Sequence, residues 1–246
     1  LLGPGLNIKR SPLCGRNFEY FSEDPYLAGK MAAAYVRGIQ KNGIAACPKH
    51  FAVNSQELRR MASDSIVDER TLREIYLTGF EMVVKEAQPK TIMSAYNLIN
   101  GTYANENAHL LQDILRKDWG FDGAVVTDWG GSNDHALGVK NGSTLEMPCP
   151  GDDSIRELIK AVQTGKITEA DVDARLKELL ELVFTTKAAV DAAPSKFDAD
   201  DHHALARRAA AQSIVLLKNE NSLLPLAKGE KVAVIGDFAQ TPRYQG

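Results

Sequence analysis

The sequence is poor in cysteine and carries little net charge of either sign. Its 246 residues include three cysteines, Cys14, Cys47 and Cys149, and the formal net charge is -3. The cysteines are odd in number, widely spaced and not in Cys-x-x-Cys pairs, which argues against a disulfide framework or a zinc site. Free thiols also favour, weakly, a reducing and therefore cytoplasmic compartment.

Several partner classes lack a sequence signature. There is no basic stripe for a nucleic acid and no polybasic segment for a membrane surface. No apolar run approaches the roughly 20 residues that span a bilayer. No Gly-x-Gly-x-x-Gly follows a predicted strand, so a dinucleotide cofactor is not supported. The composition, 44% hydrophobic and 25% charged, is that of an ordinary globular chain.

The two ends do not resemble natural termini. The sequence opens at Leu1-Leu2-Gly3-Pro4 without an initiator methionine and stops at Gly246, shortly after the apolar stretch 232–235. We therefore expect a piece of a longer protein. On that interpretation the absence of a signal peptide says nothing about secretion.

Apolar strand candidates alternate with helical patterns along most of the chain. The predicted strands lie within 1–8, 44–47, 91–94, 123–128 and 144–147, and the predicted helices at about 25–41, 68–87, 109–117, 152–163 and 168–184, with a short helical piece from 136. Thr168 and Asp171 resemble a capping box. This alternation predicts a parallel α/β fold.

The stretch 123–131 is the most informative of these strands. Its apolar residues end in Thr127, Asp128 and Trp129, so a carboxylate follows a strand that is buried on both faces. In a (β/α) barrel, catalytic side chains are mounted at this end of the strands. The alternative is that Asp128 only caps the following segment.

Other polar residues follow strands or occupy long loops. Together they predict a polar rim at the C-terminal ends of the barrel strands. Lys49, His50 and Tyr96 end two strands, and the loops 10–25 and 54–60 carry Arg16 and Arg60. Such donors suit a neutral polyhydroxy ligand. An ionised aspartate beside cations could attack an electrophilic sugar carbon, and Trp129 offers a flat apolar face. The pattern predicts the nucleophile half of a retaining glycosidase.

A set of motifs in a fixed order connects these residues to a known family. They are Gly15-Arg16-Asn17-Phe18-Glu19 with Glu23-Asp24-Pro25, Lys49-His50-Phe51, Asn54-x-Gln56-Glu57-x-x-Arg60, Met93-Ser94-Ala95-Tyr96-Asn97 with Asn100-Gly101, Val126-Thr127-Asp128-Trp129, Ile214-Val215-Leu216-Leu217-Lys218-Asn219 and Leu223-Leu224-Pro225-Leu226. In this order they cover essentially the whole chain. The sequence resembles glycoside hydrolase family 3, of the β-glucosidase kind.

The resemblance implies an α/β architecture in two parts. Residues 1–185 would form an incomplete TIM-type barrel that lacks its first strand, and residues 202–246 would begin an α/β sandwich domain. The stretch 186–201, rich in alanine and aspartate, is interpreted as a linker. In the second part we expect a helix at about 202–212 and strands at 214–217 and 232–235.

The resemblance also implies roles for individual residues. Asp128 would be the nucleophile, and Tyr96 would lie beside it. The hydroxyls of the sugar at the non-reducing end would be bound by Arg16, Lys49, His50, Arg60 and Tyr96, and its pocket would be lined by Met93 and Trp129. Glu19 and Glu57 are interpreted as partners of the arginines. The expected partner is a small carbohydrate, and this hydrolysis requires neither metal nor cofactor.

Two departures bear on the proton donor. In the hexosaminidase branch of the family an Asp-Ser-His context supplies the acid/base, whereas this chain has Asp64-Ser65-Ile66. The glucosidase branch carries an acid/base glutamate on its second domain, which would lie beyond Gly246. A sugar-binding aspartate would precede Leu1. Residues 1–246 alone are therefore expected to be poorly active.

Other interpretations stay open at this point. The substrate could be a β-xyloside or an arabinoside, or the protein could be a non-catalytic sugar-binding homologue. Lys49 at a strand end could instead form a Schiff base, as in barrel aldolases. His50, Met93 and Trp129 could be plain core residues. The oligomeric state, including a homo-oligomer, is left open.

Overall fold

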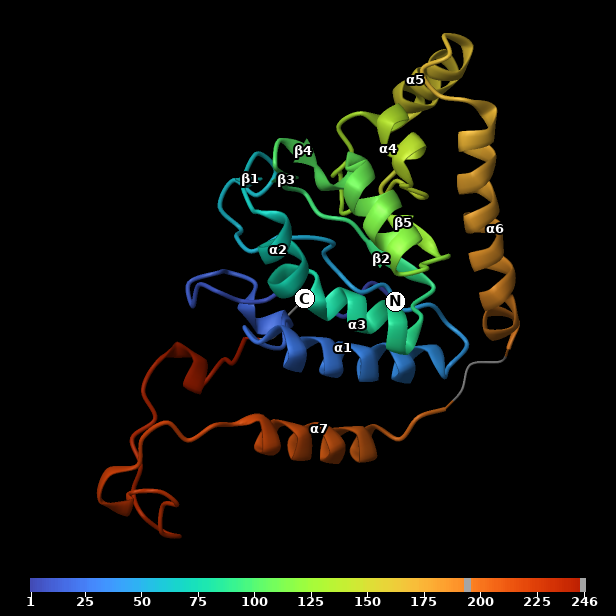
Figure 1. Ribbon diagram of the computed structural model, residues 1–246. Helices are drawn as coiled ribbons and strands as arrows, with labels where there is room; N and C mark the ends of the chain where they lie inside the picture. Colours follow the sequence, from blue (N-terminus) through green and yellow to red (C-terminus); the bar gives the residue numbers. More distant parts are fainter. Residues whose placement is uncertain (193–195, 244–246) are drawn as a thin grey trace. The chain divides into compact units, whose positions relative to one another are not determined.

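A computed structural model describes residues 1–192 and 196–243 of the chain. The chain divides into two units, Leu1–Ala192 and Ala193–Gly246, which are described separately (Figure 1). No helix in these described ranges is long and apolar enough to cross a membrane.

The first unit mixes short strands with longer helices. Its helices are α1 (Pro25–Gln40), α2 (Glu69–Thr71), α3 (Thr78–Ala87), α4 (His135–Asn141), α5 (Asp152–Gln163) and α6 (Glu169–Asp191), with 3-10 turns η1 (Asn17–Glu19) and η3 (Ala104–Glu106) and the π-helical segments η2 (Leu72–Tyr76) and η4 (His109–Asp118). Its strands are β1 (Asp64–Ser65), β2 (Thr91–Met93), β3 (Leu98–Ile99), β4 (Thr102–Tyr103) and β5 (Ala124–Val126).

Five extended segments lie side by side and run parallel, in the order of the chain. Residues 1–6 pair with 47–49, through the Gly5–Lys49 bridge, and residues 46–51 pair with β2. β2 then pairs with β5, and the end of β5 bridges to Leu145. This order confirms the predicted parallel α/β architecture, because parallel neighbours need a crossover between them and helices supply most of these crossovers. A smaller sheet, in the order β1-β3-β4, lies outside this series.

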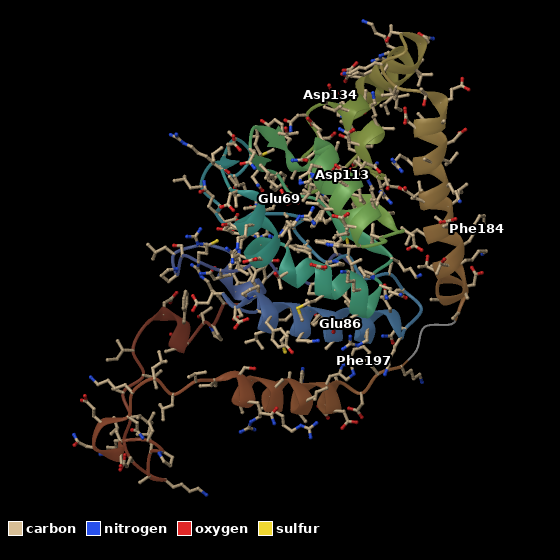
Figure 2. The ribbon with its side chains drawn as sticks, viewed as in Figure 1. Glu69, Glu86, Asp113, Asp134, Phe184 and Phe197 are labelled. Carbon is tan, nitrogen blue, oxygen red and sulfur yellow. The ribbon has the colours of Figure 1, made fainter. Side chains whose placement is uncertain are left out.

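Helices α1 and α3 pack against each other at the outside of this series (Figure 1). Two glycines allow the close approach: a Cβ on Gly29 of α1 would lie 2.8 Å from Met82 Sδ and 3.1 Å from Gly79 Cα. The contact is reinforced at the surface, where Glu86 of α3 accepts from Lys30 of α1 at 2.6 Å (Figure 2).

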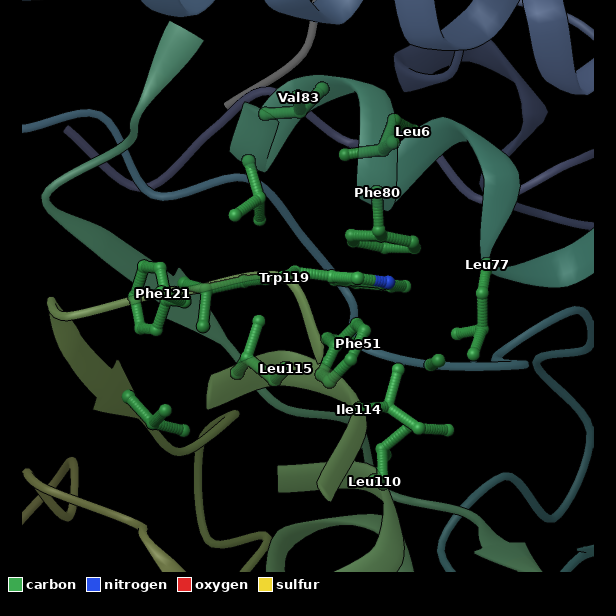
Figure 3. Close-up of a cluster of buried hydrophobic side chains, with 14 of the residues drawn as sticks. Leu6, Phe51, Leu77, Phe80, Val83, Leu110, Ile114, Leu115, Trp119 and Phe121 are labelled. Carbon is green, nitrogen blue, oxygen red and sulfur yellow. The ribbon is translucent and has the colours of Figure 1, made fainter. Parts of the chain in front are cut away.

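A single large apolar cluster fills the space between the helices and the parallel segments. Figure 3 shows its aromatic centre, where Phe51 makes edge-on contacts with Phe80 and Trp119 at centroid distances of 5.2 and 5.8 Å. Phe51 is fully buried. Burying an aromatic ring contributes about 2–3 kcal/mol. Because Phe51 directly follows Lys49 and His50, the same packing fixes the backbone that carries those two site residues.

Helix ends in the first unit follow the predicted caps. The Asp68 side chain accepts from the Thr71 backbone N–H, and the predicted helix 68–87 runs through α2, η2 and α3. The capping box at Thr168 and Asp171 is present in both directions. The predicted helix 168–184 ends too early, however, since α6 continues to Asp191.

The predicted linker 186–201 is helical at both ends. Its first residues belong to α6, and its last belong to α7 (Ala199–Ser213), whereas residues 193–195 lie outside the described residues. Alanine is the strongest helix former, and Lys187 pairs with Asp191 one turn on at 2.6 Å. Residues 186–191, although low in large apolar side chains, therefore continue α6.

In the second unit, the predicted helix 202–212 is confirmed as part of α7, and short 3-10 turns follow at η5 (Glu220–Ser222) and η6 (Asp237–Ala239). The predicted strands 214–217 and 232–235 are wrong for this structure: neither stretch forms a ladder within residues 196–243. The side chains of Leu217 and Ile235 are 92% and 90% exposed. A strand needs a neighbouring strand to pair its backbone groups, and the described residues provide none here.

Candidate active site

Asp128 lies two residues beyond β5 and is only 7% exposed. Its Oδ1 accepts from the backbone N–H of Trp129 at 2.8 Å. Its Oδ2 is buried and has no hydrogen-bonded donor among the described residues. The capping interpretation is therefore wrong: the following helix, α4, is capped by Asp134, whose side chain accepts from the Leu137 N–H.

His50 is the residue that contacts the free oxygen of Asp128. Its Nε2 lies 3.4 Å from Asp128 Oδ2, and its side chain is 1% exposed. The side-chain amide of Asn7 holds its backbone, since Nδ2 donates to His50 O at 2.8 Å and Oδ1 accepts from His50 N at 2.7 Å. The backbone of His50 is thus held by the residue that follows the first parallel segment.

Burial and surrounding cations keep the His50 ring neutral. Desolvation is the main cause, and Arg16, Lys49 and Lys9 add to it, so that the pKa of His50 falls well below its ordinary value. The contact with Asp128 therefore joins a neutral ring to a carboxylate and is not an ion pair. The other ring nitrogen, Nδ1, lies 2.8 Å from the hydroxyl of Tyr20.

Arg16 and Lys49 share one carboxylate partner. Arg16 Nε donates to Glu19, and Lys49 Nζ lies 3.5 Å from the other Glu19 oxygen. Burial opposes ionisation of Glu19, but the bond to Arg16 and the charges of Arg16 and Lys49 outweigh it and lower the pKa of this carboxyl. Arg16 Nη2 also reaches His50 Nε2 at 3.4 Å. These contacts match the expectation that Glu19 partners an arginine.

Arg60 and Tyr96 form the opposite edge of the site. Arg60 Nη1 donates to Glu57 at 2.8 Å, and its guanidinium stacks 4.5 Å over the Tyr96 ring. The Tyr96 hydroxyl donates to the carbonyl of Trp129 at 2.8 Å. Burial and the negative charge of Asp128 raise the pKa of Tyr96 to about 12, so the phenol stays protonated.

The two expected pocket-lining residues differ in exposure. Trp129 is 44% exposed, so its indole is open to a ligand. Met93 is 2% exposed and packs with Cys47, Val126 and Met147. In this structure Met93 therefore supports the strand ends from inside rather than presenting a surface.

Sequence reasoning missed Tyr20 and Asn7, which both hold His50. Tyr20 directly follows the Gly15–Glu19 motif, so its position beside that motif was the available signal. Asn7 offered no comparable signal, because its partner is a backbone group 43 residues away.

A cavity of about 630 Å³ lies elsewhere, between the start of loop 10–25 and the segment 53–71. Its lining includes Arg10, Asp64 and Tyr76 but none of the predicted site residues. It is therefore distinct from the cluster around Asp128.

The arrangement combines one buried carboxylate oxygen without a donor with a chain of polar contacts. His50 lies against Asp128, Arg16 reaches His50, and Arg16 and Lys49 share Glu19. Within the described ranges no group of three or more His, Cys, Asp or Glu side chains is placed to hold a metal ion. The geometry suits recognition of hydroxyl groups and attack by a carboxylate.

Comparisons with known proteins point to one family. The profile of the glycosyl hydrolase family 3 N terminal domain matches residues 1–182. The thermostable beta-glucosidase B of Acetivibrio thermocellus is 51% identical over the whole chain, which spans 32% of that protein. An exo-alpha-(1->6)-L-arabinopyranosidase of Bifidobacterium longum is 48% identical, with 33% of its length covered.

Solved structures are similar in fold as well. A family 3 beta-glucosidase of Bifidobacterium adolescentis superposes with a TM-score of 0.92 and 46% identity, over the whole of this chain and 36% of that one. Beta-glucosidase 3B of Thermotoga neapolitana, solved with alpha-D-glucose, gives 0.87 and 43% identity over 92% of this chain and 33% of its own. This chain spans about a third of the length of these relatives. It belongs to glycosyl hydrolase family 3.

Proposed function

We propose that the protein is a retaining β-glycosidase that removes terminal, non-reducing β-D-glucosyl residues through a covalent intermediate on Asp128. The observation that carries the proposal is the buried Oδ2 of Asp128, which has no donor among the described residues and lies 3.4 Å from His50 Nε2, itself reached by Arg16. Relatives named beta-glucosidases, similar over the whole chain, support the choice of sugar.

In the first step Asp128 Oδ2 attacks the anomeric carbon while the bond from that carbon to the leaving oxygen breaks. Oδ1 stays held by the Trp129 N–H, which orients the carboxylate. The leaving oxygen takes a proton from a general acid. Water then gives its proton to the deprotonated general acid and attacks the same carbon, which releases Asp128 and returns the configuration to β.

The general acid is proposed to be a glutamate outside residues 1–246. Glu19 and Glu57 are poor candidates because each is engaged with an arginine. An acid in this reaction needs a raised pKa, whereas that of Glu19 is lowered.

A second substrate class has a specific observation in its favour. The relative from Bifidobacterium longum, named an arabinopyranosidase, is nearly as similar as the glucosidases. Both sugars could occupy a site that binds ring hydroxyls through cations and an imidazole. Comparing kcat/KM on aryl β-glucoside, β-xyloside and α-L-arabinopyranoside decides between them.

Replacing the nucleophile tests the proposal. In the natural full-length protein, Asp128→Asn should lower kcat on an aryl β-glucoside by roughly 10³-fold or more, because the bond-forming group is lost. Asp128→Ala should regain turnover with added azide and release a glycosyl azide of α configuration, since azide attacks from the vacated side.

The matched control is Asp122→Asn, the same substitution at an exposed position at the other end of β5. It should keep the parent kcat. A sugar-binding protein without catalysis would show no turnover in the parent and only weaker binding after Asp128→Asn. An active parent that tolerates Asp128→Asn would overturn the nucleophile assignment.

A further inference from the structure

We propose that Tyr20 is a positioning residue: its hydroxyl donates to Nδ1 of His50 and thereby fixes the single ring proton on Nε2, which faces Asp128. The link to sugar recognition rests on the proposed function. The arrangement of the two side chains does not, and it can be tested separately.

Each ring nitrogen of His50 has a polar neighbour that influences whether it is protonated. The Tyr20 hydroxyl lies 2.8 Å from Nδ1, with the two rings tilted by 48°. On the other side, Nε2 lies 3.4 Å from Asp128 Oδ2 and 3.4 Å from Arg16 Nη2. The ring is 1% exposed, so water does not compete freely for either nitrogen.

The phenol's own proton decides between the two neutral forms of the ring. Within residues 1–192, Nδ1 of His50 is the hydrogen-bond partner found for the Tyr20 hydroxyl. If Nδ1 carried the proton, the buried phenol would accept from it and would lack an acceptor for its own O–H, which is costly. Lys9 over the Tyr20 ring, 3.5 Å from its centroid, supplies donors only.

The two groups around Nε2, Asp128 and Arg16, favour opposite protonation states of this nitrogen. Asp128 Oδ2 lies 3.4 Å from Nε2 and has no hydrogen-bonded donor among the described residues, so its negative charge favours a proton on Nε2 through electrostatic attraction rather than a formed hydrogen bond. Arg16 Nη2 would favour a lone pair there. Arg16 also donates to Glu19, so part of its donor capacity is already used, whereas Asp128 Oδ2 has no donor. The Tyr20 bond therefore sets the form with the proton on Nε2.

This assignment makes His50 a hydrogen-bond donor in the site. With its proton on Nε2, His50 joins Arg16 and Lys49 as a donor. A sugar hydroxyl at this place accepts from the imidazole and can donate to a carboxylate. Losing the Tyr20 hydroxyl lets the ring change form and weakens that contact.

The direct test is ring ¹⁵N NMR of the natural full-length protein with labelled histidine, using Tyr20→Phe. This variant removes the hydroxyl but keeps the ring beneath Lys9. The parent should show a protonated Nε2 and an unprotonated Nδ1 for His50, identified by their loss in His50→Gln. In Tyr20→Phe the Nδ1 signal should shift and the form protonated on Nδ1 should appear. Tyr26→Phe, at a 63% exposed tyrosine of α1, should leave the signals unchanged.

Kinetics give a second readout that a merely structural role would not move. Tyr20→Phe should lower kcat/KM on an aryl β-glucoside by about tenfold, the size of one hydrogen bond. On aryl β-glucosides that each lack one hydroxyl, the effect should vanish for one analogue, the same one on which His50→Gln loses its effect. A uniform loss on all analogues would contradict the inference.

The outcomes separate the inference from the proposed function. A parent with Nδ1 protonated, or identical ring signals in Tyr20→Phe, overturns the inference even if the protein is an active glycosidase. Absence of glycosidase activity overturns the proposed function, while the NMR result still decides the role of Tyr20.

Discussion

His50 is the residue at which folding and the site are most tightly linked. Its backbone is held by Asn7, its neighbour Phe51 lies in the core, and its ring is buried among cations. Burial, with the charges of Arg16 and Lys49, lowers its pKa well below the ordinary value of about 6.5. The folded protein therefore keeps this ring neutral at a pH at which the unfolded chain would protonate it.

Stability should fall as the pH drops through the unfolded pKa of this histidine. Above about pH 6.5 both states are neutral and the group contributes nothing. Below this pH only the unfolded chain binds the proton. At one pH unit lower, this decreases the free energy of unfolding by about 1.4 kcal/mol. Urea unfolding at about pH 7.5 and 5.5 should show a smaller loss in His50→Gln than in the parent. His203→Gln, at an exposed position of α7, should retain the parent's loss; an unchanged loss in His50→Gln would contradict the account.

At this scale the sequence identified the polar residues but not their partners. Strand-end positions and motif resemblance pointed to Asp128, His50 and Lys49; in the structure His50 contacts Asp128, whereas Lys49 contacts Glu19. The Asn7 clamp joins residues 43 apart, and no local pattern specifies such a contact. Met93 shows the converse: the motif suggested a pocket wall, whereas local packing buries it with Cys47 and Val126.

At the scale of elements, helices were predicted better than strands. Helical spacing located α1 and α5 closely, because this signal is local. The outer parallel segments are extended but make only isolated bridges, as at Gly5 and Leu145. Whether an extended stretch becomes a regular strand depends on its neighbours, which lie far away in the sequence.

The contact between α1 and α3 predicts opposite effects for one substitution at two glycines of the same helix. Gly29→Ala would place a methyl group 2.8 Å from Met82 Sδ and 3.1 Å from Gly79 Cα, so it should destabilise the protein by about 1–3 kcal/mol. Gly38→Ala meets nothing within 4 Å and should stabilise it by up to about 1 kcal/mol through helix propensity. Urea unfolding midpoints measure both; a stabilised Gly29→Ala would contradict the close approach.

At the scale of the whole molecule, the two units differ in whether their own residues form a buried core. Residues 1–192 bury a continuous core, whereas all the described side chains of 196–243 are exposed. The apolar stretches 214–217 and 232–235 have the composition of buried strands but find no partners within 196–243. Their sequence correctly indicates β propensity, and propensity without a neighbouring strand does not build a sheet.

The family assignment rests on the whole chain, while the reaction rests on one side chain. All 246 residues of this chain match the relative from Acetivibrio thermocellus, so the family is shared. Fold and family do not by themselves specify a reaction. The proposed chemistry requires that Asp128 become bonded to the sugar.

Trapping that bond is the most direct measurement. The natural full-length protein would be incubated with a 2-deoxy-2-fluoro-β-glucoside carrying a good leaving group. The fluorine slows both the formation and the hydrolysis of the glycosyl-enzyme. The good leaving group makes formation the faster of the two steps, so the intermediate accumulates. Peptide mapping by mass spectrometry should find one fluoroglucosyl group, on Asp128, and none in Asp128→Asn. A label on Glu19, Glu57 or any other residue would contradict the account.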